Sequence, residues 1–200
     1  MALRWFRDKF FDLEVQTARN GGLDVYDLMT NIAAEIPAGS EGLVVLPHLE
    51  GAACPEFNPA ARAVFYGATL RHTKAHFTRA IMESVAFMLK VNLDIVEELG
   101  VSVQEVRSMG GGARSALWLQ IKADVLQKPV TPVAIEDAAC LGAALMAATA
   151  IGAFSSLEEG VDRMVRLGST VGSNPESPEV YQQGYSQYLE LYERLAPMFA

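Results

Sequence analysis

Apolar residues recur at helical spacing along most of the chain. Side chains that one helix face can gather are three and four positions apart, and Asn-Gly-Gly, Pro or Gly follows several of these stretches. Thr73 stands where an N-cap is needed, and Gly100 supplies a left-handed stop. The pattern predicts helices over residues 3–17, 24–36, 73–99, 115–126, 138–152 and 179–195, with further helix after residue 155.

Four shorter apolar runs, rich in β-branched residues, predict strands. The clearest is "GLVVLPHL", which is bounded by glycine and is too short for a helix. A segment with two prolines, residues 51–61, is expected to be a surface loop, and a polar break is expected at residues 168–178. The predicted strands cover residues 42–49, 63–70, 101–109 and 129–135.

From residue 101 to residue 152 the elements alternate as strand, glycine turn, helix, strand and helix. Alternation of this kind favours an α/β domain in which helices pack on a mixed or mostly parallel sheet. The chain has 200 residues, of which 50% are apolar, so it can bury a sizeable core. We see no internal repeat and no low-complexity tract.

Composition narrows the classes of function. The formal net charge is −8, which argues against a nucleic acid partner, because proteins that bind phosphate backbones present a basic face. The two cysteines, Cys54 and Cys140, are far apart and indicate neither disulfides nor a zinc site, which fits a reducing cytoplasm. The start of the chain has no signal-peptide character. Residues 138–154 fall short of the roughly 20 apolar residues of a membrane span, so we expect a buried helix and no membrane partner.

The strongest candidate for chemistry is "MGGGARSALWLQIKAD", residues 109–124. Consecutive glycines after a strand allow a sharp turn and close approach of a flat ligand, and the helix that follows offers free N–H donors. The segment matches neither the phosphate-binding loop G-x-x-x-x-G-K-[ST] nor the dinucleotide pattern G-x-G-x-x-G. A nucleotide site and a purely structural corner both remain open from these residues alone.

Other candidates also have two interpretations. Gly142, inside an alanine-rich helix, indicates close approach of a ligand or backbone, or else tight helix packing. His72 and His76 have the spacing of two metal ligands but no completing motif, so we interpret them as solvated surface residues and predict no metal site. Glu83 is predicted to be a buried, hydrogen-bonded carboxylate, either a catalytic base or, as we favour, a structural partner.

Five blocks, taken together, resemble the C-terminal domain of the FGGY carbohydrate kinases, and most closely the xylulokinase and gluconokinase branch. They follow the order and spacing of that family over nearly the whole chain. The blocks are "ALRWFRD" (2–8), "LVVLPHLEG" (43–51), "NPAARAVFYGATLRHTKAHFTRAIMESVAF" (58–87), "GGGARSALWLQIKADVLQKPV" (110–130) and "EDAACLGAALMAA" (136–148).

The resemblance implies one half of a two-domain kinase with a ribonuclease H-like, actin-like ATPase fold, as in sugar kinases, hsp70 and actin. It implies that residues 1–200 form the C-terminal nucleotide-binding domain, with a helical extension from about residue 155. ATP would lie in the cleft between the two domains. The residues implied to face the nucleotide are Gly110, Gly111, Gly112, Ala113, Ser115 at the adenine, and Leu3 and Arg4 beside it.

The implied reaction transfers the γ-phosphoryl group of ATP to a sugar or polyol hydroxyl, with Mg²⁺ and a carboxylate base. The family's phosphate loops and catalytic aspartate precede the "ALRWFRD" block, so we expect no catalytic residue here and no turnover from these 200 residues alone. The expected partners are ATP or ADP, a sugar or polyol, and an N-terminal kinase domain that this chain lacks. An exposed interdomain face would also favour self-association, including a homodimer.

Departures from the family pattern leave the substrate open. Ala52 and Ala53 replace a usual Glu-Arg pair, His48 replaces a usual tyrosine, and Asp137 stands where glutamate is common. A xylulose-like substrate is the leading expectation. A second hypothesis is a regulatory or binding module that retains the actin-like half-fold without catalysis.

Overall fold

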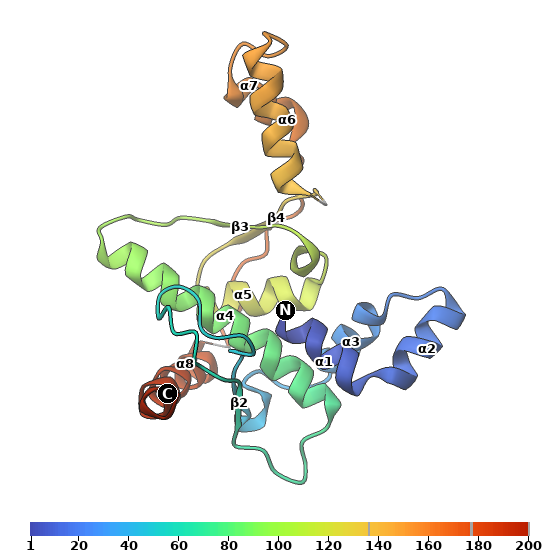
Figure 1. The fold of residues 1–200 in the computed structure, drawn as a ribbon, viewed down its shortest axis with the longest axis vertical. Helices are drawn as coiled ribbons and strands as arrows, with labels where there is room; N and C mark the ends of the chain where they lie inside the picture. Colours follow the sequence, from blue (N-terminus) through green and yellow to red (C-terminus); the bar gives the residue numbers. More distant parts are fainter. Residues whose placement is uncertain (136, 177, 200) are drawn as a thin grey trace.

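The long helix α4 (Lys74–Glu98) crosses the centre of the molecule and organises the other elements around it, as the computed structural model shows (Figure 1). The structure describes residues 1–135, 137–176 and 178–199. Glu136, the first residue of the fifth block, lies outside them. The other helices are α1 (Ala2–Phe10), α2 (Asp12–Gly21), α3 (Val25–Ala34), α5 (Ala116–Leu126), α6 (Ala138–Ala150), α7 (Leu157–Met164) and α8 (Pro178–Leu195), with 3₁₀ turns η1 (Ser40–Gly42), η2 (Gly111–Ala113) and η3 (Ala196–Met198).

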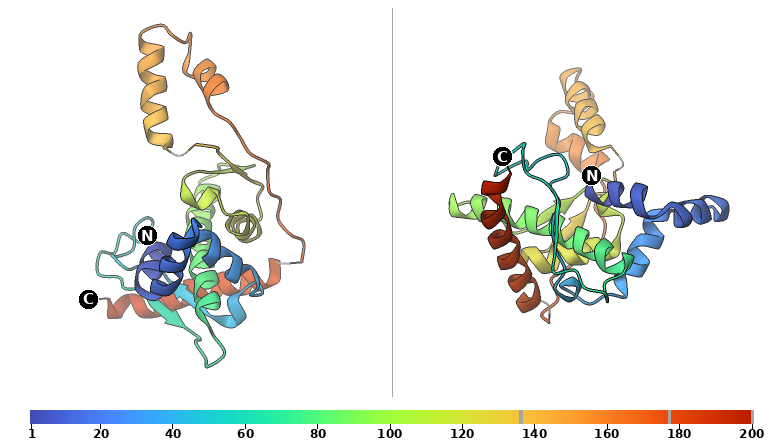
Figure 2. Two further views of the ribbon diagram at one scale, coloured as in Figure 1. Left: turned by 90° about the vertical axis from the view of Figure 1, so that its right-hand side faces the viewer. Right: turned by 60° about the horizontal axis from the view of Figure 1, so that its bottom comes forward.

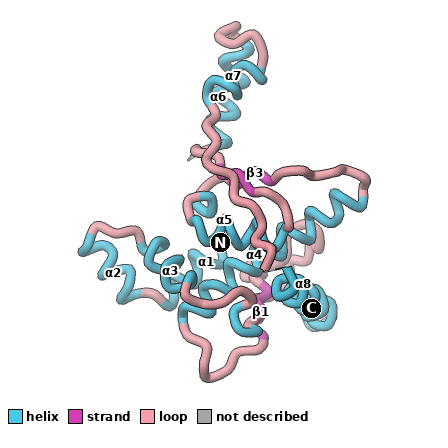
Figure 3. Tube along the Cα trace, turned by 180° about the vertical axis from the view of Figure 1, so that it is seen from behind, coloured by secondary structure: helices cyan, strands magenta, loops and turns pink. Residues whose placement is uncertain are grey.

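Most elements form one unit, which we call the body: α1 to α5, the strands and α8. Two of the strands pack on α5 around a small cluster of Leu119, Ala123 and Val130, and the other elements share one larger hydrophobic core. Phe11, Met29, Leu46 and Met82 are fully buried there, and Tyr188 brings α8 into the same cluster. Figure 3 shows α8 beside α4 from behind, consistent with the contacts between them. The apolar stripes that predicted the helices therefore face one another.

Four short strands form two separate pairs. β1 (Val44–Leu46) and β2 (Val64–Tyr66) are antiparallel, whereas β3 (Val106–Ser108) and β4 (Val130–Pro132) are parallel. The sequence predicted all four strands but made each of them longer. The single mixed sheet expected from the alternation is absent among the described residues, where the pairs stay apart.

The first predicted helix was partly wrong, whereas the polar break between helices was confirmed and contains one pairing that the sequence did not predict. Phe11 lies between α1 and α2 with φ −118° and ψ 30°, so residues 3–17 form two helices where the pattern predicted one. The side chain of Phe11 is fully buried, which favours a bend that local periodicity cannot register. In the predicted break, Val171 pairs with Val130 of β4 through two backbone hydrogen bonds of 2.9 Å.

Helices α6 and α7 form a hairpin, residues 138–164, which we call the arm and which projects away from the body (Figures 1 and 2). The prediction of a buried helix here was wrong: Leu145 is the only buried residue of α6, and Met146 is 59% exposed. A Cβ at Gly142 would meet nothing within 4 Å, so neither close approach nor tight packing occurs there in this structure. The helix is apolar, but α7 is the element packed against it.

The histidines correct a second expectation. His76 is buried and completes a capping box with Thr73, whose backbone N–H donates to its Nδ1 at 3.2 Å. His72 is half-buried, with its ring 5.2 Å from that of His76. His48 is also buried, and burial lowers its pKa. The prediction that His72 and His76 are solvated surface residues was therefore wrong. The first turn of α4 and the segment before it pack the two rings together and partly cover them.

Glu83 is a buried, hydrogen-bonded carboxylate, as predicted. Its oxygens accept from the Gly39 amide at 3.0 Å, from Ser40 Oγ at 2.7 Å and from Arg79 Nε at 2.9 Å. Arg79 in turn donates to the hydroxyl of Tyr181 at 2.9 Å. The group links η1, α4 and α8, which supports the structural interpretation.

Among the described residues, no helix is both long and apolar enough to cross a membrane.

Candidate functional site

The glycine turn, residues 110–113, joins the end of β3 to the start of α5. Gly110 has φ 73° and ψ −164°, a backbone conformation that L side chains rarely adopt, so glycine is required at this corner. Ser115 then caps α5 by accepting a hydrogen bond from the Trp118 amide at 3.2 Å. Strand, turn and capped helix are arranged as the sequence predicted.

A pocket of about 450 Å³ opens beside this turn. Gly111, Gly112 and Ser115 form one wall, and Leu3 and Arg4 of α1 form another. The two walls are more than 100 positions apart in the sequence, and their residues were predicted to form one site. The structure therefore brings together five of the seven residues predicted to face the nucleotide.

The other two predicted residues face a different space. Gly110 and Ala113 line a second pocket of about 240 Å³, together with Val133 and Ile135 from the segment that follows β4. The turn separates the two pockets, and Arg114 borders both. A molecule in the larger pocket would therefore meet Gly111 and Gly112 before it met Gly110 or Ala113.

Sequence reasoning missed the third wall of the larger pocket. It comes from α3 and its N-cap, which contribute Asp24, Tyr26, Asp27 and Thr30. Asp24 caps α3 by accepting from the Tyr26 amide at 2.8 Å. A capping pattern before residue 25 was visible in the sequence, but nothing in it indicated that this helix end faces the glycine turn.

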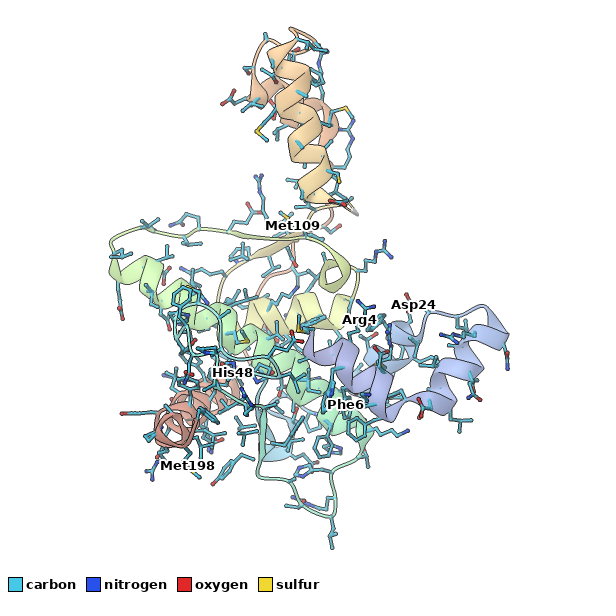
Figure 4. All side chains as sticks on the ribbon, viewed as in Figure 1. Arg4, Phe6, Asp24, His48, Met109 and Met198 are labelled. Carbon is cyan, nitrogen blue, oxygen red and sulfur yellow. The ribbon has the colours of Figure 1, made fainter. Side chains whose placement is uncertain are left out.

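The pocket combines apolar surfaces with opposite charges at its rim. Leu3 is buried, and Trp118 adds an aromatic surface that a flat ring can contact. Arg4 and Asp24 both line the pocket, and Figure 4 labels the two side chains on α1 and at the start of α3. The Arg4 side chain is 74% exposed, and its Nε is 4.0 Å from Asp8, an exposed pair that contributes little. Arg4 is therefore able to turn toward a bound anion.

Lys122 lies behind the turn and was also missed. Its ammonium donates to Ser108 Oγ at 2.8 Å and to the carbonyl oxygen of Gly112 at 3.1 Å. Burial lowers the pKa of Lys122 to about 8. The sequence signal was a single lysine within the amphipathic helix of residues 115–126, which reads as a surface position.

Within the described residues, no group of three or more His, Cys, Asp or Glu side chains could hold a metal ion. The pocket offers its ligand backbone amides, hydroxyls, two arginines and two aspartates. This set suits a polar molecule with a flat apolar part and an anionic part.

Comparison with known proteins gives the family. A profile described as the FGGY family of carbohydrate kinases, C-terminal domain, matches residues 1–151. The chain is 36% identical to the gluconokinase of Bacillus subtilis over 176 residues, which cover 88% of this chain and 34% of the relative. It is 30% identical to a xylulose kinase of Staphylococcus epidermidis over 199 residues, covering 100% of this chain and 38% of the relative.

Solved structures agree with the sequence comparison. The crystal structure of xylulose kinase from Rhodospirillum rubrum superposes with a TM-score of 0.82 at 34% identity, covering 99% of this chain and 38% of that one. The chain thus spans little more than a third of the relatives that it matches. The similarity covers both the glycine turn and the α1 wall of the pocket, since the matched residues 1–151 include them.

Proposed function

The chain belongs to the FGGY family of carbohydrate kinases as their C-terminal domain, with the actin-like α/β fold of that family, and from this premise we propose that its larger pocket binds the adenosine end of ATP. The adenine ring would lie against Leu3 and Trp118, and the glycine turn would approach it closely. Arg4 would add a cation on the side where the phosphates leave the pocket.

A single observation carries this proposal: Leu3, Arg4, Gly111, Gly112 and Ser115 line one pocket. They come from two blocks that resemble the family's nucleotide-contacting blocks, and only the fold unites them. The amides of Ala113 and Arg114 bond to carbonyls within the turn. Those of Gly111 and Gly112 have no such partner in the described chain, which leaves donors for a ligand.

For Gly110 and Ala113 we propose a second role, on the far side of the turn. They line the second pocket, which the turn separates from the first, so these two residues would support the turn from the other side and would not contact the adenine. Their contribution is expected to be smaller.

We propose that the protein at its full natural length transfers the γ-phosphoryl group of ATP to a hydroxyl of a sugar or polyol. The names of the relatives support this reaction class. This chain would supply positioning of the nucleotide, and the base and second phosphate site would come from an N-terminal domain. Mg²⁺, which offsets phosphate charge in such reactions, would enter with ATP, since the described residues provide no metal cluster.

A xylulose-like or gluconate-like acceptor is the substrate class we favour, since relatives of both names match over most of the chain. The protein at full natural length, assayed with ATP and a panel of ketopentoses and aldonates, should favour one of these acceptors. Turnover with neither would leave the regulatory-module alternative standing.

The arm supports the N-terminal kinase domain as a partner. Met146 and Ile151 are exposed on it, and an apolar helix of this kind is stabilised by a covering surface.

We retain residues 1–200 as one domain with a helical extension from about residue 155, supported by the burial of Tyr181 and Tyr188 in the body core. The homodimer and the cytoplasmic location remain predictions.

Calorimetric titration with ADP tests the nucleotide site directly. A Cβ at Gly111 would point into open space, so Gly111→Val keeps an allowed backbone and places its side chain at the pocket wall. We expect affinity to fall at least about tenfold. Gly172→Val, a glycine with equally open surroundings outside the pocket lining, is the matched control and should bind ADP normally. Absence of ADP binding by the unmodified full-length protein would refute the proposed function.

A further inference from the structure

Lys122 joins three elements behind the glycine turn. The side chain starts on α5 and is 6% exposed. Its ammonium donates to Ser108 Oγ at the end of β3, at 2.8 Å, and to the Gly112 carbonyl oxygen in η2, at 3.1 Å. The ring centroid of Trp118 lies 5.2 Å from Nζ, within the range of a cation–π contact. The buried cation thus has two hydrogen-bond acceptors and an aromatic neighbour.

Gly112 is held between these same two side chains. A Cβ built on it would lie 3.3 Å from Cε3 and Cζ3 of Trp118 and 3.4 Å from Lys122 Nζ. The indole is itself fixed, because Trp118 Nε1 donates to the Met82 carbonyl of α4 at 3.1 Å. Gly112 therefore rests against Trp118, which also lines the larger pocket, and against Lys122, which does not line it.

The peptide plane of Gly112 and Ala113 is the part of the turn that Lys122 controls. Its carbonyl accepts from the ammonium, and its N–H, on Ala113, donates to the Gly110 carbonyl at 3.0 Å. With both ends of this plane held, the neighbouring Gly111 and Gly112 amides keep one orientation at the pocket. A glycine-rich backbone without that hold has the widest choice of conformations.

We propose that Lys122 is a positioning residue of the nucleotide site: its protonated amine fixes the glycine turn from behind, so that adenine nucleotide binding requires the charged form of Lys122. This inference rests on the proposed function, because it names the residue that regulates the affinity of that same pocket. Lys122 does not line the pocket and so acts through Gly112.

The proposal gives nucleotide affinity a pH dependence. Burial is the cause of the lowered pKa of Lys122, about 8, so the amine loses its proton within a range that proteins tolerate. The charge-assisted bond to Gly112 weakens as the pH rises through that value. The surrounding elements carry further ionisable groups, among them Asp24 at the N-cap of α3, Tyr26 and Asp27 of α3, Arg79 and Glu83 of α4, Arg107 of β3, Arg114 after η2, Asp124 of α5 and Tyr181 of α8.

The test measures ADP affinity of the protein at its full natural length from pH 7 to pH 9.5. The phosphates of ADP stay ionised throughout, because their last pKa is about 6. We expect the dissociation constant to rise up to about tenfold across this range, and Lys122→Met to bind about tenfold more weakly at pH 7 with a flat profile. Lys122→Arg, which stays charged, should also give a flat profile but with tighter binding than Lys122→Met.

Lys128→Met is the control, because Lys128 follows the same helix and pairs with Glu97 at 2.7 Å, away from the turn. It should retain the pH profile of the unmodified protein. Trp118 emission, recorded in a Trp5→Phe background, provides a second readout: it should titrate near pH 8 with Lys122 present and should not titrate in Lys122→Met.

Outcomes separate this inference from the proposed function. If the unmodified protein binds ADP with equal affinity at pH 7 and pH 9.5, the positioning role is wrong while the nucleotide site stands. Equal pH profiles for Lys122→Met and the unmodified protein would overturn it as well. If the unmodified protein binds no ADP at any pH, the proposed function itself fails. Should Lys122→Met not fold, the profile of the unmodified protein still decides.

Discussion

The body and the arm differ in what happens to apolar sequence. In the body, the helices and strands bury their apolar residues in a main cluster that runs from Ala2 to Tyr188 and in a smaller one around Val130. In the arm, which projects away from the body (Figure 2), the apolar helix α6 leaves Met146 exposed, and Ile151 at its C-cap is exposed as well. Hydrophobic composition thus predicts which residues favour burial, whereas burial itself depends on a complementary surface being present.

The two regions also differ in how their polar groups are used. The body contains buried charges, Glu83 with Arg79 and the separate Lys122, and each makes hydrogen bonds between elements. The arm is held by caps, as at Ser156, and by contacts between its two helices. We therefore expect single substitutions to affect global stability in the body and only local order in the arm.

Glu83→Ala should give the largest effect. It leaves Arg79 as an uncompensated charge in the body, and loss of one partner of such a pair costs about 3–5 kcal/mol. Chemical denaturation measures the loss. The double variant Arg79→Met, Glu83→Leu removes both charges and should be more stable than Glu83→Ala. A change below about 1 kcal/mol for Glu83→Ala would contradict the described role of the pair.

Leu46→Ala and Leu157→Ala compare the same truncation in both regions. Leu46 of β1 is 0% exposed, so its loss should destabilise the body by about 2–5 kcal/mol. Leu157 of α7 is 44% exposed, and its loss should change global unfolding by less than about 0.5 kcal/mol. Equal losses in urea titrations would show that arm and body unfold as one unit.

Ser115→Ala and Ser156→Ala compare two matched caps. Each serine accepts from the backbone N–H three residues later at 3.2 Å, one on α5 and one on α7. We expect Ser115→Ala to lower global stability by about 1 kcal/mol. Ser156→Ala should instead speed amide hydrogen exchange within α7 and leave the denaturation midpoint unchanged. The expectation would be contradicted if Ser156→Ala lowered the denaturation midpoint as much as Ser115→Ala does.

Gly142→Ala should give a small, local effect of the opposite sign. A Cβ there meets nothing within 4 Å, so the substitution gains the helix propensity of alanine, about 0.5–1 kcal/mol, within α6. Exchange of α6 amides should slow in the 200-residue chain. At full natural length, a loss of kinase activity in the same variant would indicate that a covering domain approaches Gly142 closely.

Local sequence predicted the elements because their signals are local. Thr73 caps the helix that it was expected to cap, a helix begins after Ser115 as predicted, and Gly110 takes a conformation that excludes most other residues. The α1 wall and the glycine-turn wall of the pocket were predicted together because their two sequence blocks both resemble one family. A family resemblance indicates which distant residues are neighbours in space, and hydrophobic periodicity does not. Phe11 shows the limit, since its complete burial bends a stretch whose pattern continues without interruption.

The sequence by itself determined the helices, the strands, the glycine corner and the family, since caps, turns and motif order depend on residues close together in the chain. Only the tertiary structure decided that α3 closes the pocket, that Val171 pairs with β4, that α6 stands apart from the body, and that Lys122 lies beneath Gly112. These outcomes depend on which surfaces meet in space, and a lysine on a predicted helix has the same local signal whether it faces water or a backbone carbonyl.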